Sequence, residues 1–343
     1  MTVLAVADVH MTGNPREEER WGLWPWLLKQ ADKYGVRELI IAGDATEAKD
    51  RHNAMVVHRM VDELNALTYA GLYTYWLIGN HDYLDPEYPF FKFLGGLLAN
   101  FEFIIKPKEV KLSIGNTILL PNTPDWKNDW KGIDFAKFDY AFAHQTFSGA
   151  VTETGYRLID GLPADALDDV RIKAYSGDIH VPQKFGKRGE YIGAPYRTRH
   201  GDKYEGRVLL IENSKGKHKQ TDLHYETKGK HLIEIRTLDD MDGLKIPKGG
   251  YVKVRVRVSR ADLPNWQETK AKVKAEVERR GWEVHDVEME RIDVGLTRET
   301  AKLELKGSLT SPRSTFDQYC KSKKTPKAVI DEGRDILSKL GAR

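Results

Sequence analysis

Short apolar runs alternate with longer amphipathic stretches over residues 1–123. Apolar runs at 3–7, 38–42 and 72–78 predict buried strands. Hydrophobic positions recur at helical spacing between these runs and predict helices at 17–34, where Pro25 marks a kink or boundary, and at 54–70. Strands that alternate with helices indicate a sheet covered by helices.

Closely spaced apolar runs replace this pattern in the next part of the chain. They predict strands at 110–114, 117–120, 140–143, 172–175 and 208–211. A mixed sheet followed by a β-rich half predicts an α/β fold, in which two packed mixed sheets are flanked by helices as a four-layer sandwich.

A more polar composition near residues 228–230 predicts the start of a second domain. Valines at 252, 254, 256 and 258 alternate with Lys253, Arg255 and Arg257, so this strand would have one apolar and one basic face. A helix at 264–280 and a strand at 282–292 complete a small strand-helix-strand unit. We therefore expect a catalytic domain at 1–228, a small α+β domain at 229–308 and a helical tail at 309–343.

The tail has the pattern of a basic amphipathic segment. Ser311-Pro312 predicts one helix start and Thr325-Pro326 another. Such a tail commonly docks on a partner, and its candidate contact residues are Phe316, Tyr319, Ile330 and Leu337.

The composition excludes several classes of protein. The 343 residues are 40% hydrophobic and 31% charged, which is typical of a globular protein with more than one domain. A single cysteine, Cys320, rules out an intramolecular disulfide and a cysteine-based zinc site. No apolar run reaches the roughly 18 residues that cross a bilayer, and the start lacks a signal-peptide pattern, so we expect a cytoplasmic protein with no membrane partner. The net charge of +3 is too small to indicate nucleic-acid binding by itself.

Five polar motifs follow apolar runs in a fixed order. They are Asp8-Val9-His10, Gly43-Asp44, Gly79-Asn80-His81-Asp82, Ala143-His144 and Gly177-Asp178-Ile179-His180. Residues two apart at a strand end point to the same side, so Asp8 and His10 can hold one ion together. The carboxylate of Asp44 can bridge two ions. Ligands at the carboxyl ends of strands converge over a sheet, so the motifs predict a two-metal centre.

A two-metal centre favours phosphoester hydrolysis. Two ions roughly 3.5–4 Å apart bind the attacking and phosphoryl oxygens of an in-line displacement. His81 is then left to protonate the leaving group or to stabilise charge, and Asp82 to orient His81. Taken singly, Gly-Asp is an ordinary turn and His144 a core histidine. The conjunction of all five motifs favours the metal centre.

These motifs resemble those of the calcineurin-like metallophosphoesterase superfamily, D-x-H, G-D, G-N-H-D, a lone His and G-H-x-H, over residues 2–180. The resemblance implies that the fold is a metallophosphoesterase sandwich and that His81 is a catalytic imidazole that binds no metal. It assigns one metal to Asp8, His10, Asp44 and His180, and the other to Asp44, Asn80, His144 and Asp178.

The chain departs from the family pattern at two positions. Asp178 stands where the fifth motif usually has histidine, and a carboxylate there should favour manganese or magnesium over zinc. The second motif ends in Ala45-Thr46-Glu47, whereas the nuclease members have G-D-x-F-D.

Within the superfamily, the chain most resembles the SbcD-type subunit of DNA double-strand break repair nucleases. That resemblance implies a manganese-dependent exonuclease, with endonuclease activity left open, that acts with an SMC-like ATPase of the SbcC type. It implies that the small domain caps the site and contacts DNA, and that the tail binds the ATPase. A homodimer through the catalytic domain is a further expectation.

Candidate DNA contacts are Arg51, His52, Lys253, Arg255 and Arg257, because duplex binding needs spaced positive charge. For the last three, a charged strand face that resists aggregation is an equal alternative. For the first two, a solvated helix start is nearly as good an interpretation. Two other functions also stay open: a dimetal phosphatase or phosphodiesterase acting on nucleotides or phosphoproteins, and a non-catalytic scaffold that binds DNA ends.

Overall fold

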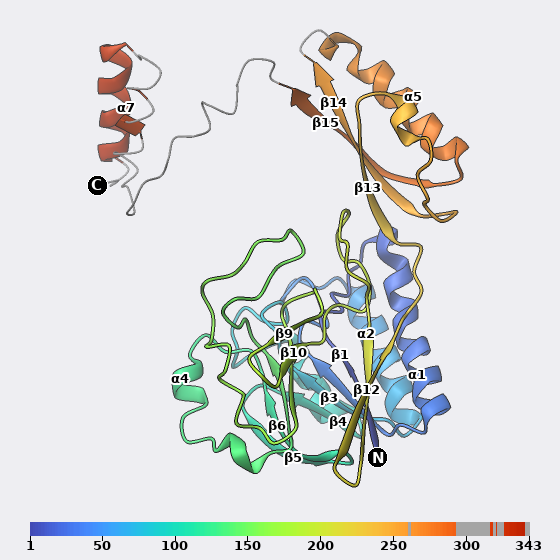
Figure 1. Cartoon of the computed structure of the whole chain (residues 1–343), viewed down its shortest axis with the longest axis vertical. Helices are drawn as coiled ribbons and strands as arrows, with labels where there is room; N and C mark the ends of the chain where they lie inside the picture. The colour runs from blue at the N-terminus through green and yellow to red at the C-terminus, as the bar shows by residue number, and fades with distance from the viewer. Residues whose placement is uncertain (260–261, 293–315, 318–319, 321–325, 340–343) are drawn as a thin grey trace. The chain divides into compact units, whose positions relative to one another are not determined.

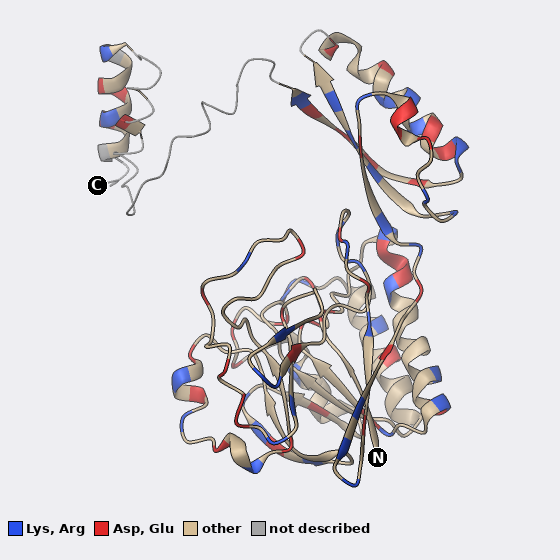
Figure 2. Ribbon diagram, in the orientation of Figure 1, with Lys and Arg blue, Asp and Glu red and all other residues tan. Residues whose placement is uncertain are grey.

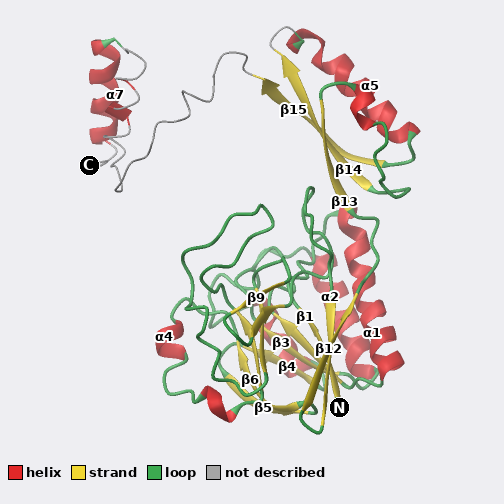
Figure 3. Ribbon diagram, in the orientation of Figure 1, coloured by secondary structure: helices red, strands yellow, loops and turns green. Residues whose placement is uncertain are grey.

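The computed structural model describes residues 1–259, 262–292, 316–317, 320 and 326–339 (Figure 1). The chain divides into two units, Met1–Arg291 and Ile292–Arg343. The first unit holds two large mixed sheets that are flanked by helices, and a third, smaller sheet (Figure 3). The predicted α/β sandwich is therefore confirmed.

The first large sheet has the strand order β12-β11-β1-β2-β3-β4. Its strands are β1 (Thr2–Val6), β2 (Glu38–Ala42), β3 (Tyr73–Leu77), β4 (Phe101–Ile104), β11 (Val208–Ser214) and β12 (Lys217–Leu223). Strands β1 to β4 are parallel, and β11 and β12 add antiparallel pairs at one side.

The second large sheet has the order β5-β6-β7-β8-β10-β9. Its strands are β5 (Lys108–Leu112), β6 (Gly115–Leu120), β7 (Tyr140–His144), β8 (Lys173–Gly177), β9 (Gln183–Phe185) and β10 (Gly189–Tyr191). Strands β6, β7, β8 and β10 are parallel neighbours. Val3 and Ala5 of the first sheet share a buried cluster with Phe142 and Tyr175 of the second, so the two sheets pack face to face.

Helices α1 (Leu23–Tyr34) and α2 (Ala54–Tyr69) cover the outer face of the first sheet, where Trp24 and Leu64 join its buried cluster. A 3₁₀ helix, η1 (Pro15–Gly22), precedes α1, so the helix predicted at 17–34 is two elements. Pro25 lies in the first turn of α1 and causes no break, because N–H groups there have no partner within the helix. The outer face of the second sheet is covered by loops and by short helices such as α4 (Trp126–Asp129).

The small sheet has the order β13-β14-β15, with β13 (Lys230–Ile235), β14 (Tyr251–Ser259) and β15 (Glu283–Ile292). The four valines of β14 pack against Val273 and Val277 of helix α5 (Trp266–Arg279). The predicted strand-helix-strand unit is present as β14, α5 and β15, and β13 adds a parallel strand that the sequence did not predict.

The second unit contains helix α7 (Lys327–Lys339), which begins where Thr325-Pro326 predicts a start. Phe316 lies against Gly333, where a Cβ atom would meet its ring, and Asp317 accepts a hydrogen bond from Arg334. The helix start predicted at Ser311-Pro312, Tyr319 and the domain boundary at 308/309 lie outside the described residues. Within the described ranges, no helix is both long and apolar enough to cross a membrane.

Candidate metal centre

The five motifs meet at one edge of the sandwich. Asp8 and His10 follow β1, Asp44 follows β2, and Asn80 and His81 follow β3 in the first sheet. His144 ends β7, while Asp178 and His180 follow β8 in the second sheet. Because β1, β2 and β3 are parallel neighbours, as are β7 and β8, their carboxyl ends bring these side chains together.

Four of the predicted ligands lie on strained backbone. Asp8, His10, Asp44 and Asp178 have φ of 54°, 50°, 51° and 85°. This left-handed conformation is uncommon outside glycine and persists where the surroundings hold it in place. Here the N–H of Asp8 donates to the carbonyl of Gly43 at 3.1 Å, and the N–H of His10 donates to that of Asp44 at 2.9 Å. The first two motifs therefore hold each other in shape.

Two motif glycines make room for the ligands. A Cβ atom at Gly43 would meet the ring of His144, and one at Gly79 would meet the carboxylate of Asp44. Any side chain at either position would push a predicted ligand out of place. The glycines of the G-D and G-N-H-D motifs are therefore required because the ligands occupy the space that a side chain would need.

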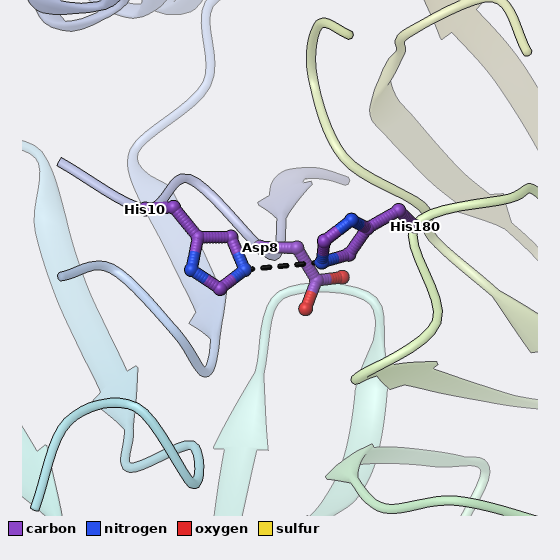
Figure 4. Close-up of side chains that lie close together, drawn as sticks. All are labelled: Asp8, His10 and His180. Carbon is purple, nitrogen blue, oxygen red and sulfur yellow. Dashed lines mark hydrogen bonds between the residues drawn. The ribbon is translucent and has the colours of Figure 1, made fainter. Parts of the chain in front are cut away.

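Asp8, His10 and His180 form one group of three converging ligand atoms (Figure 4). The Nε2 atoms of His10 and His180 are 3.1 Å apart. One oxygen of Asp8 accepts the N–H of Asp178 at 2.9 Å, whereas the other, Oδ2, is buried and has no hydrogen-bond partner among the described residues. A buried carboxylate oxygen without a partner is costly, and a bound cation would satisfy it. The residues present therefore fit a metal ion.

Asp44 lies between the two halves of the centre. Its Oδ2 atom is 3.7 Å from Nε2 of His10 and 3.4 Å from Nε2 of His144. Its Oδ1 atom accepts the N–H of His81 at 2.8 Å. One carboxylate oxygen thus faces an imidazole from each sheet, which is the placement that a bridging ligand needs.

His144 is fully buried and fixed in orientation. Its Nδ1–H donates to the carbonyl of Ala42 at 2.7 Å, which leaves Nε2 free to bind a metal. That Nε2 atom is 3.2 Å from Oδ1 of Asn80 and 4.0 Å from Oδ1 of Asp178. The other oxygen of Asp178 accepts the hydroxyl of Thr146. Asn80 and Asp178 therefore face the imidazole with which the resemblance groups them.

The electrostatics of the centre favour positive charge. Burial raises the pKa of Asp8 to about 6, although His144 and His180 oppose the shift. Burial also acts to raise the pKa of Asp44, but His144 and His10 outweigh it and hold that pKa well below its usual range. Burial acts to lower the pKa of His144, but Asp44 raises it well above its usual value. Buried carboxylates of this kind need a cation nearby.

His81 is less enclosed than the predicted ligands. Its side chain is 36% exposed, and its Nδ1–H donates to the backbone carbonyl of Glu47 at 3.2 Å. The ring makes an edge contact with His10 at a centroid distance of 4.9 Å. His81 therefore lies beside the centre with Nε2 available.

The predicted role of Asp82, to orient His81, is wrong. The buried Asp82 carboxylate instead accepts hydrogen bonds from the N–H and hydroxyl of Thr46, the indole of Trp76 and the N–H of Gly79, at 2.9–3.1 Å. Glu47, through its carbonyl, holds the His81 ring. Asp82 thus fixes the turn that carries Asn80 and His81.

Asp82→Ala should lower the free energy of unfolding by about 3 kcal/mol or more, because each buried donor left without an acceptor costs roughly 1–3 kcal/mol. Urea denaturation of the metal-free protein measures this. Asp32→Ala, on the exposed surface of α1, is the control, with an expected change within about 0.5 kcal/mol. A change in Asp82→Ala as small as that of the control would contradict the structural role.

Several residues at the centre were not predicted from the sequence. The cavity beside the metal ligands has a volume of about 370 Å³, and the unpredicted residues of its lining include Glu17, Arg20, Glu47, Glu153, Thr198 and Arg199. An oxygen of Glu47 lies 2.6 Å from Nδ1 of His10. Glu47 was visible only as a departure from the family motif, and its contact with His10 depends on the fold.

The predicted DNA contacts lie outside this lining. Lys253, Arg255 and Arg257 form ion pairs with glutamates of the neighbouring strands, Glu234 on β13 and Glu288 and Glu290 on β15. Figure 2 shows both basic and acidic positions along the small sheet. The basic face of β14 is thus largely neutralised, which favours the alternative of a charge-protected strand.

The other two predicted DNA contacts, Arg51 and His52, precede α2. Arg51 is exposed, whereas His52 is half-buried. The ring of His52 lies 5.1 Å from that of Phe90 and 4.8 Å from that of Phe91. His52 therefore packs on aromatic side chains, and DNA contact by any of the five residues stays a prediction.

A comparison with protein families agrees with the geometry of the centre. The model of the calcineurin-like phosphoesterase family matches residues 1–182, which include all seven predicted metal ligands. A comparison with curated proteins finds no match. Because the family model covers more than half of the 343 residues, the chain belongs to the calcineurin-like phosphoesterase family.

Proposed function

We propose that this protein is a two-metal phosphodiesterase that cleaves DNA, with manganese as its preferred ion and magnesium as a substitute. One observation carries the proposal: Oδ2 of Asp44 faces imidazoles from both sheets, 3.7 Å from His10 and 3.4 Å from His144. A carboxylate in this place is suited to hold two ions together. The carboxylates and the amide oxygen of the ligand set are hard donors, which supports manganese or magnesium.

The geometry assigns separate tasks to the side chains. His10, His180 and Asp8 would hold one ion, His144, Asn80 and Asp178 the other, and Asp44 both. The chemistry that two bound divalent ions supply is neutralisation of phosphoryl charge and activation of water. His81 holds a proton on Nδ1 through the Glu47 carbonyl, so its Nε2, once protonated, can donate to the leaving oxygen. The carbonyl of Ala42 keeps the Nδ1 proton on His144.

The regions outside the family match support a macromolecular substrate and partner. The small sheet attaches beside the cavity, where Arg16 of η1 donates to the carbonyl of His285 on β15 at 2.8 Å. Helix α7 exposes 53% of Val329 and 51% of Ile336, so it presents apolar surface in the part that the structure describes. We propose that α7 contributes to binding an SMC-like ATPase, with Ile330 and Leu337 on the contacting face. A homodimer through the catalytic domain remains part of this proposal.

End-labelled single-stranded and double-stranded DNA tests the function directly. The full-length protein should shorten labelled DNA in the presence of Mn²⁺, more slowly with Mg²⁺, and not at all with excess chelator. Asp44→Asn is the matched negative control, because it keeps the side-chain shape and removes the charge. Intact DNA in Mn²⁺, together with hydrolysis of a small phosphodiester, would contradict DNA as the substrate while leaving the phosphoesterase centre in place.

The second candidate is a phosphatase or phosphodiesterase that acts on nucleotides or phosphoproteins. The ion pairs of Lys253, Arg255 and Arg257 favour it, because these cations are occupied by glutamates rather than free for a phosphate backbone. Rates on p-nitrophenyl phosphate and bis-p-nitrophenyl phosphate separate the two. A preference for the monoester supports a phosphatase. A preference for the diester is expected of both a nuclease and a nucleotide phosphodiesterase, and cleavage of the labelled DNA then distinguishes these two.

A further inference from the structure

The small sheet joins the first unit through a buried charged side chain. Lys230, the first residue of β13, is 4% exposed. Its ammonium donates to Oε1 of Glu17 at 2.5 Å and to the carbonyl of Thr198 at 2.8 Å. A lysine this deeply buried is unusual and requires such partners.

Glu17 and Arg20 carry the contact from Lys230 toward the metal ligands. Oε1 of Glu17 also accepts from Arg20 at 2.6 Å, and Oε2 accepts the hydroxyl of Thr12 at 2.7 Å. Arg20 is 5% exposed and donates to the backbone carbonyl of His10 at 2.6 Å. The backbone of a predicted ligand is thus two ion pairs away from the small sheet.

Thr198 provides a second connection to the centre. Its carbonyl accepts from Lys230 and, at 3.2 Å, from Arg20. Its hydroxyl oxygen lies 3.0 Å from Nδ1 of His180. If Nε2 of His180 holds a metal, Nδ1 would carry the proton and donate a hydrogen bond to the hydroxyl oxygen of Thr198, which would fix the ring.

The contact between the small sheet and η1, made by Lys230, Glu17, Arg20 and Thr198 and called the joint below, is held by buried charges and not by apolar packing. Burial acts to raise the pKa of Glu17, but Arg20 and Lys230 outweigh it and hold the pKa below its usual value. Burial and Arg20 lower the pKa of Lys230, although Glu17 opposes the shift. Apolar side chains would fill such a joint at a smaller desolvation cost. The charged and polar side chains instead form directional hydrogen bonds, which hold the backbone carbonyl of His10 and the ring of His180 in place.

We propose that Lys230, Glu17, Arg20 and Thr198 are positioning residues that couple the attachment of the small sheet to the placement of His10 and His180. The inference rests on the metal centre of the proposed function but does not depend on which phosphoester is cleaved. Metal affinity would then depend on the contacts of these four residues as well as on the metal ligands. A ligand that shifts the small sheet would then change how tightly the centre holds its ions.

Lys230→Met and Thr198→Val in the full-length chain test the coupling. Lys230→Met removes the ammonium that donates to Glu17 and to the carbonyl of Thr198, whereas Thr198→Val removes only the hydroxyl beside His180. Each variant keeps the approximate side-chain volume. Because partners of metal ligands typically change metal affinity by roughly 10–100-fold, each variant should raise the Mn²⁺ dissociation constant, measured by isothermal titration calorimetry, by about that factor. Lys228→Met is the matched control: Lys228 forms an exposed ion pair with Glu283, 2.6 Å long, and its loss should change the constant less than about twofold.

The double variant gives the sharper result. If the two residues act through one network, Lys230→Met with Thr198→Val should weaken Mn²⁺ binding by less than the product of the single effects. Single variants that lower the thermal midpoint of the metal-free protein but leave Mn²⁺ affinity unchanged would overturn the proposal and make the network a structural joint only. Wild-type protein that binds Mn²⁺ but leaves DNA intact would refute the nuclease function and not the coupling. If Lys230→Met fails to fold, the milder Thr198→Val decides by the same readout.

Discussion

Asp44→Asn should abolish two-ion binding and reduce phosphodiester hydrolysis by more than about 100-fold, since loss of even an outer partner of a metal ligand costs roughly 10–100-fold. The oxygen that faces both His10 and His144 loses its charge, while the side chain keeps its shape. The backbone conformation at this position, φ 51°, is one that asparagine also tolerates. The effect should therefore reach the centre without unfolding the chain.

Calorimetry with Mn²⁺ and hydrolysis of bis-p-nitrophenyl phosphate measure this prediction together. Asp62→Asn makes the same chemical change on the exposed surface of α2 and should leave both quantities unchanged. Full activity in Asp44→Asn would mean that this carboxylate bridges nothing.

His81→Ala should separate catalysis from metal binding. A positioned proton donor contributes roughly 10²–10⁴-fold to a rate, so kcat should fall by about that factor. Mn²⁺ affinity should stay within a few-fold, because His81 is not among the seven predicted ligands and lies at the more exposed edge of the centre.

The matched control is His58→Ala, which removes an exposed histidine from α2 and should leave kcat unchanged. If His81→Ala instead loses Mn²⁺ binding in proportion to its activity, His81 is a ligand. The geometry permits that outcome, because ring nitrogens of His10 and His81 and an oxygen of Asp44 lie within 4.8 Å of one another.

The convergence of the motifs could be predicted because each motif directly follows an apolar run that the sequence identifies as a strand. Strands such as β2 and β3 are largely buried runs of five residues that the sequence identifies to within one residue at each end, and parallel neighbours bring their ends together. The short strands β9 and β10, of three residues each, were not predicted. Their sequences, Gln-Lys-Phe and Gly-Glu-Tyr, are too short to show a period. Strand β10 forms by pairing with β8, and β9 by pairing with β10.

The partners of side chains were harder to predict than their positions. Sequence shows Arg255 as an unpaired charge, whereas the register of the small sheet places Glu234 and Glu288 beside it. Asp82 is next to His81 in the sequence, but the turn points its carboxylate toward Thr46 and the indole of Trp76 instead. Such pairings depend on contacts between distant elements, which a local pattern does not contain.

The left-handed backbone at Asp8, His10, Asp44 and Asp178 limits which ligands this centre can acquire by mutation. Aspartate, asparagine and histidine tolerate positive φ better than other residues that carry a side chain, whereas β-branched side chains rarely adopt it. Exchange of histidine for aspartate, the departure seen at Asp178, is therefore among the few changes of metal chemistry that this backbone permits. At these four positions, unlike at Asn80, His144 and His180, the backbone thus favours aspartate, asparagine and histidine over other ligand residues.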